Sequence, residues 1–213
     1  MRPSRLRVLT LAAALVGWSG LVAPRLPTRW ATPVHAALGA VLVRWTDAPL
    51  GLRPPASRSG GRLGLSAAGA VAVAVASATV VPAVRVGMRK RSMPEPVAEW
   101  LLVRIPIGTV WSEETAFRAA LGTVAAQSFG PRWGRILQAV AFGLSHVADA
   151  RGAGETVVGT VAVTGVAGWV FGWLYDRSGS LVAPMLAHLA VNEAGAVAAL
   201  VVQRQGLMVD SPI

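Results

Sequence analysis

The sequence contains no cysteine among its 213 residues. This absence excludes disulfide bonds, catalysis by a thiolate and metal sites with cysteine ligands. Charged residues are also scarce, at 14%, whereas 54% of the residues are hydrophobic. The mean hydropathy of +0.54 lies well above the balance of a soluble domain. We therefore interpret the chain as an integral membrane protein whose main surroundings are the lipid bilayer.

Acidic residues are outnumbered by basic ones, which gives a formal net charge of +10. All but one of the 20 basic residues are arginines, and they are scattered beside prolines, glycines and the edges of apolar runs. No basic helix or patch interleaved with aromatic residues emerges, so we do not expect nucleic-acid binding. The positive charge is better explained by arginines at the ends of membrane spans, where they contact anionic lipid head groups, than by nucleic-acid binding.

The length allows about six or seven spans of about 20 residues with short connections. It leaves little room for a separate soluble domain. The fold class that we expect is therefore all-α, a polytopic transmembrane bundle of about six to seven helices.

The N-terminal region, residues 1–92, is predicted to hold membrane helices and one interfacial loop. A basic start and an apolar run without a clear cleavage site predict an uncleaved first span over 7–24. Residues 31–43 are apolar but short, 46–64 form a polar connection rich in proline and glycine, and 64–84 form a clear span. Three early arginines favour a cytoplasmic N-terminus, although the basic residues further along divide almost equally between the two sides of the membrane.

The following region, residues 93–205, is organised differently, and 206–213 is expected to be a tail. Apolar segments lie at 97–127, 133–147, 156–175 and 181–203. Three of these segments carry polar side chains within their limits, and ionisable groups inside a membrane are costly and mark functional sites. These side chains are Glu113, Glu114, Arg118, His146, His188 and Asn192.

The spacing of these polar residues predicts which of them share a helix face. Glu114 and Arg118 are four residues apart, so they can form a buried ion pair, while Glu113 is rotated by about 100° and remains free. His188 and Asn192 share a helix face in the same way. Phe142 stands one turn before His146 and can form a wall beside it.

Each polar residue alone could be a packed, hydrogen-bonded structural group. Their occurrence together favours a functional role, because each polar side chain that is buried in hydrocarbon without a partner costs free energy. Convergence on one polar cavity inside the membrane would satisfy them together. We therefore predict an intramembrane cavity that Glu113, His146, His188 and Asn192 share.

Three motifs occur in this half in a fixed order: "EETAFR", "FGLSH" and "HLAVN". Together they resemble the E-E-x-x-x-R, F-x-x-x-H and H-x-x-x-N motifs of the CPBP intramembrane proteases. That family includes the CAAX prenyl endopeptidases and the Abi-like bacteriocin-processing or immunity proteins. The resemblance covers about residues 97–200. Ala119 and Trp111 depart from the usual residues at their positions, which bears on substrate fit more than on chemistry.

The resemblance implies a protease in which Glu113 acts as the base and His146 helps to hold the attacking water. His188 and Asn192 would supply donors to the developing oxyanion. Arg118 would form an ion pair with Glu114 and thereby hold in place the helix that carries Glu113. The substrate expected is a membrane-anchored protein or a peptide, and the composition, rich in alanine and arginine, favours a bacterial plasma membrane.

Several alternatives stay open. Zinc could be held by Glu113, His146 and His188, which would match a catalytic site with three protein ligands, although the H-E-x-x-H signature is missing. We favour glutamate chemistry without a cofactor. A non-catalytic membrane partner, such as an immunity or regulatory protein, is the next alternative. A proton-coupled transporter is less favoured, because the sequence has no internal repeat.

Overall fold

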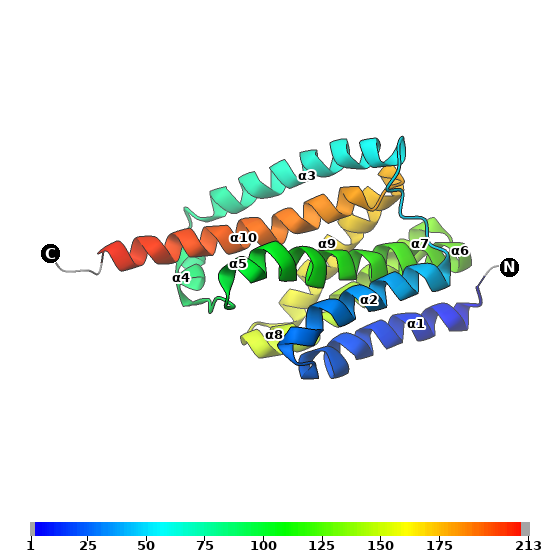
Figure 1. Ribbon diagram of the computed structural model, residues 1–213, viewed down its shortest axis with the longest axis horizontal. Coiled ribbons are helices and arrows are strands. Elements are labelled where there is room, and N and C mark those ends of the chain that lie inside the picture. The colour runs from blue at the N-terminus through cyan, green and yellow to red at the C-terminus, as the bar shows by residue number, and fades with distance from the viewer. Residues whose placement is uncertain (1–2, 210–213) are drawn as a thin grey trace.

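The computed structural model describes residues 3–209, which form helices joined by short connections and contain no strand (Figure 1). In the N-terminal half, α1 continues through one π-helical and one 3₁₀ turn to Arg25, and α2 returns antiparallel to it. A connection leads to α3 and then to the short α4. The bounds are α1 Arg5–Gly17, α2 Thr28–Thr46, α3 Ala56–Ala78 and α4 Pro82–Lys90.

The C-terminal half begins with one long helical rod over residues 97–129. Its parts are α5 Val97–Glu99, the π-helical η3 Trp100–Trp111 and η4 Glu114–Leu121, and α6 Gly122–Phe129. Pro106 lies inside η3 and has no backbone N–H, so the regular α-helical hydrogen-bond ladder is interrupted there. The remaining helices are α7 Pro131–Ser145, α8 Val147–Ala153, α9 Val157–Ser178 and α10 Val182–Val209.

Four helices are long and apolar enough to cross a membrane, and they cover 5–25, 56–78, 157–178 and 182–205. Large hydrophobic side chains on their outer surfaces are exposed, for example Val73, Val158 and Val163. Such exposure suits contact with lipid. The expected all-α membrane bundle is confirmed, and the protein is an integral membrane protein.

The polar connection expected over 46–64 is only partly correct. Helix α3 already begins at Ala56, directly after two prolines, and ends at Ala78, before the expected limit of 84. The first turns are helical despite their polar sequence because Gly60 and Gly64 pack against the chain at Ser180 and Ala183. Packing against a distant part of the chain therefore stabilises these turns as a helix, although their sequence is not apolar.

The C-terminal end of the chain also differs from the expected boundary. Helix α10 runs without a break to Val209, so it includes residues 206–209 of the expected tail. The last four residues of that tail lie outside the described residues, as do the first two residues of the chain. The division into regions 1–92 and 93–205 stays a prediction.

The two halves of the chain share one hydrophobic core. Leu11 and Leu15 of α1 are buried together with Phe117 of η4 and Phe142 of α7. In Figure 1, α1 and α2 flank the rod 97–129 on one side, while α3 and α10 run side by side on the other. Glu114, the first residue of η4, and Glu113 just before it therefore lie between helices from both halves.

Candidate active site

The expected ion pair between Glu114 and Arg118 is present. Arg118 Nε lies 3.2 Å from Glu114 Oε2, and both side chains are 0% exposed. The guanidinium carbon of Arg118 also lies 3.8 Å from the ring centroid of Phe142 and 5.0 Å from that of Phe171. Since the cation is completely buried, the carboxylate and the two ring faces replace its hydration.

Glu114 binds a second partner that sequence spacing did not indicate. His188 Nδ1 lies 2.7 Å from Glu114 Oε1. A carboxylate only accepts hydrogen bonds, so Nδ1 carries the proton and the other ring nitrogen, Nε2, is directed away from Glu114. His188 Nε2 lies 3.7 Å from Glu113 Oε2. The two glutamates thus contact the two nitrogens of one imidazole, and Glu114 sets its orientation.

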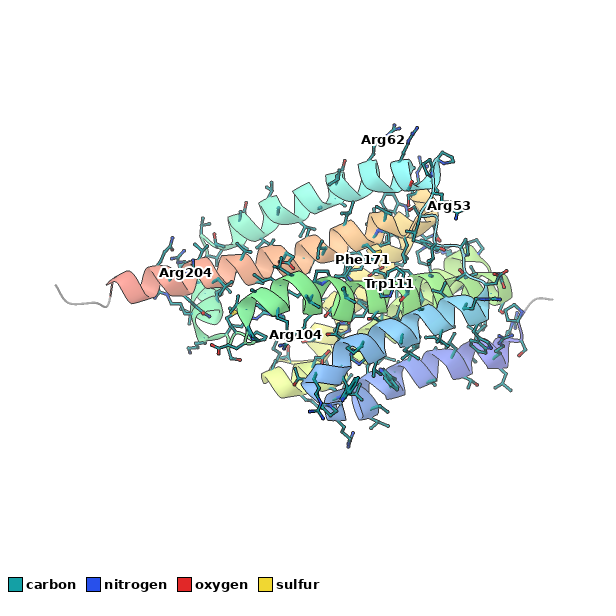
Figure 2. All side chains as sticks on the ribbon, viewed as in Figure 1. Arg53, Arg62, Arg104, Trp111, Phe171 and Arg204 are labelled. Atoms are coloured by element: carbon teal, nitrogen blue, oxygen red, sulfur yellow. The ribbon has the colours of Figure 1, made fainter. Side chains whose placement is uncertain are left out.

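Aromatic rings hold the two histidines of the motifs in place. His188 stacks on Phe171, with ring centroids 4.9 Å apart, and Phe142 lies edge-on to both His146 and His188 at 4.7 and 6.2 Å. Figure 2 shows Phe171 and Trp111 in the middle of the bundle. Phe142 therefore packs against both imidazoles, and its role as a cavity wall stays a prediction.

His146 ends helix α7, with φ −90° and ψ 5°. Its Nδ1 lies 2.8 Å from the carbonyl oxygen of Phe142. That contact requires a donor at Nδ1, so Nε2 of the neutral ring keeps its lone pair. The end of the helix thus presents an imidazole whose tautomer its own backbone determines.

A cavity of about 240 Å³ lies beside these groups and is lined by Glu113 and His146. Glu113 is 28% exposed, and its Oε2 is buried without a hydrogen-bond partner among the described residues. The other walls come from the ends of α1 and α8 and from the middle of α2. A polar cavity is therefore present, and two of the four residues that were predicted to share it line it.

Two residues that the sequence analysis did not select also line the cavity, His35 of α2 and Asp149 of α8. Nε2 of His35 is buried and has no hydrogen-bond partner in the part of the chain described. Burial raises the pKa of Asp149, an effect that His146 opposes and Glu113 strengthens. An ionisable residue within the apolar segment 31–43 was a signal for His35, whereas Asp149 resembled part of a loop.

The motif residues do not all face this cavity. His188 and Asn192 are not among its lining residues, although His188 Nε2 lies 3.7 Å from Glu113 Oε2. Asn192 Nδ2 donates to the carbonyl oxygen of His188 at 3.1 Å. One N–H of the amide is thus used within α10, and a single N–H remains for any other acceptor.

The residues considered for zinc do not form a metal site as they are placed. Within residues 3–209, no three side chains of histidine, aspartate or glutamate are grouped closely enough to hold one ion. Glu113 and His188 approach each other to 3.7 Å, but His146 does not join them in such a group. We therefore derive no catalytic step through a metal.

Comparison with known families agrees with the motifs. Residues 96–194 match the family model described as type II CAAX prenyl endopeptidase Rce1-like. No curated protein and no solved structure matches the chain. The matched residues include all three motifs and every residue of the ion-pair and histidine network. Over this segment the chain is therefore similar to the CPBP family of membrane proteases, in agreement with the resemblance of its motifs.

Proposed function

We propose that the protein is an intramembrane endopeptidase in which Glu113 and His146 activate a water molecule. The observation that carries this proposal is the partnerless Oε2 of Glu113 in a polar cavity that it shares with His146. An unpaired carboxylate oxygen beside such a cavity is free to accept a proton from a water molecule held there. The backbone contact at His146 Nδ1 leaves Nε2 to accept a hydrogen bond from the same water.

In the proposed reaction, Glu113 removes a proton from the water, and the hydroxide oxygen bonds to the carbonyl carbon of the scissile peptide. The resulting tetrahedral intermediate places negative charge on the former carbonyl oxygen, where donors stabilise it. The free N–H of Asn192 supplies one donor, and His188 supplies another through Nε2 when its ring is protonated on both nitrogens, because its Nδ1–H is donated to Glu114. Glu113 then delivers its proton to the amine as the C–N bond breaks, so that protons and charges balance.

Glu114 and Arg118 act through other residues in this mechanism. Glu114 orients His188 by a 2.7 Å contact, and Arg118 pairs with Glu114 in a buried position. This arrangement resembles the way in which a carboxylate fixes the ring of an active-site histidine in many enzymes. Both residues are positioning residues.

The substrate is proposed to be a membrane-anchored protein or a peptide. A cavity of about 240 Å³ accommodates a scissile bond with one or two adjacent side chains and not a folded domain. We propose further that the protein lies in a bacterial plasma membrane with its N-terminus in the cytoplasm.

The test compares the membrane proteomes of cells that contain the wild-type protein or the Glu113→Gln variant. Glu113→Gln replaces the base by a neutral group of the same shape, so loss of general-base catalysis should lower turnover by about 10²–10⁴. We expect at least one peptide whose cleavage disappears in the variant although both proteins accumulate to the same level. Identical proteomes would favour a non-catalytic membrane partner, and proton uptake that depends on Glu113 would favour a transporter.

A further inference from the structure

A second pocket, which shares no lining residue with the cavity beside Glu113, lies between the first turns of α3 and the last turns of α9. Its volume is about 630 Å³, and its lining includes Arg58 and Arg62 from α3 together with Trp173 and Arg177 from α9. Each of these pairs is four residues apart in its helix, so both members of a pair share one face. The two faces meet because α3 packs against α9.

The three arginines of this pocket have no acidic partner among residues 3–209. The arginines that do form ion pairs are Arg118, with Glu114, and Arg135, with Asp176. Asp176, the acidic residue next to Arg177, is therefore already paired with Arg135 of α7. The pocket lining contains three guanidinium groups and no carboxylate, which makes it a site of strong positive potential.

The position of the pocket identifies the kind of anion that would reach it. Both α3 and α9 are candidate spans, and the pocket lies where α3 begins and α9 ends. Figure 2 shows Arg62 and Arg53 at this end of α3, which is also the end of the bundle that carries the N-terminus in Figure 1. Trp173 is 40% exposed there, as is usual for tryptophan at the boundary between hydrocarbon and water.

We propose that this pocket binds the head group of an anionic phospholipid. Arg58, Arg62 and Arg177 would donate to the phosphate oxygens, because guanidinium groups match phosphate geometry with paired donors. Trp173 would lie beside the glycerol and the first carbons of the acyl chains. Basic pockets between membrane helices bind anionic head groups in this way. The proposal does not depend on peptidase activity.

The experiment measures binding of phosphatidylglycerol and phosphatidylcholine to the purified full-length protein by native mass spectrometry. The test variant is R58Q/R62Q/R177Q. The matched control, R29Q/R89Q/R91Q, removes the same charge from exposed arginines outside the pocket. We expect wild type to prefer phosphatidylglycerol, and we expect the test variant to lose roughly 100-fold in affinity for it, with a much smaller loss in the control.

A second measurement keeps the proposal testable if the triple variant fails to fold. Ser59 lines the pocket and the chain has no cysteine, so Ser59→Cys provides one labelling site for a fluorophore. Brominated phosphatidylglycerol should quench this label more strongly than brominated phosphatidylcholine. The proposal is overturned by equal quenching, by equal losses in the two triple variants, or by displacement of the lipid with millimolar glycerol phosphate, which would indicate a site for a soluble phosphate.

Discussion

At the level of single residues, the two adjacent glutamates have different surroundings. Glu114 is completely buried and contacts both Arg118 and His188. Glu113 is partly exposed, and its Oε2 lies 3.7 Å from Nε2 of His188. Their difference follows from rotation around the helix, because neighbouring positions on a helix face different environments.

Replacement of Glu114 by glutamine should destabilise the protein. The variant leaves Arg118 buried without its counter-charge, and breaking a buried pair costs about 3–5 kcal/mol. It also weakens the contact that orients His188, so any folded protein should be inactive. Thermal unfolding in detergent and peptide turnover measure the two effects.

Glu113→Gln is the control for this experiment, since it should unfold near the wild-type temperature while turnover is lost. A Glu114→Gln protein that is as stable and active as wild type would show that the buried network is dispensable. The assignment of the two glutamates would be reversed if Glu113→Gln alone failed to fold.

Removal of metal distinguishes catalysis by a glutamate base from catalysis by zinc. Glu113, His146 and His188 do not form a three-ligand group in the structure, and the proposed reaction uses a carboxylate base. We therefore expect turnover to persist after exhaustive chelation, with no stoichiometric zinc in the active protein by elemental analysis. Loss of turnover that zinc restores, and that other divalent ions do not, would contradict glutamate chemistry.

At the level of helices, small residues determine how closely α3 and α10 approach. A Cβ added at Gly64 would lie 2.9 Å from the backbone of Ala183, and one added at Gly60 would lie 2.8 Å from Ser180. Helices in membranes associate by close packing of such residues rather than by a hydrophobic driving force. Because α10 carries His188, this contact also helps to determine the position of one wall of the active site.

Gly64→Ala should therefore destabilise the protein by about 1–3 kcal/mol, the usual cost of overpacking, because the backbone of Ala183 cannot move aside as a flexible side chain could. Gly69→Ala in the same helix is the matched control, since nothing lies within 4 Å of its added Cβ. Thermal unfolding in detergent should separate the two variants. Equal melting temperatures would show that α3 and α10 are loosely packed.

At the level of the whole molecule, the two ends of the bundle should face opposite sides of the membrane. Ser4 precedes α1 at the N-terminal end, whereas Ala153 ends α8 near the other end of the bundle (Figure 1). Both residues are exposed, and the chain has no cysteine. Single-cysteine variants at these positions can therefore be labelled without background.

We expect a membrane-impermeant maleimide to label Ala153→Cys in intact cells and Ser4→Cys only in inverted vesicles, because three early arginines favour a cytoplasmic N-terminus. Labelling after detergent solubilisation controls for accessibility. The reverse pattern would place the N-terminus outside the cytoplasm. Labelling of both positions from one side would contradict the transmembrane arrangement.

The sequence by itself determined the class of the protein and its helices. Apolar runs of sufficient length predict spans, because the bilayer requires internally hydrogen-bonded helices. The ordered motifs identified the family of residues 96–194 and the pairing of Glu114 with Arg118, since both depend on spacing within the chain. The helical start of α3 was missed, because it depends on contact with a segment more than a hundred residues away.

The tertiary structure alone decided which groups meet from different helices. His188 bonds to Glu114, His35 and Asp149 face Glu113 across one cavity, and Asn192 turns back to its own helix. None of these contacts follows from spacing, because the relative rotation of two helices is set by the packing of all their side chains together. The sequence therefore determined which polar groups enter the membrane, and the packing of the helices decided which of them meet.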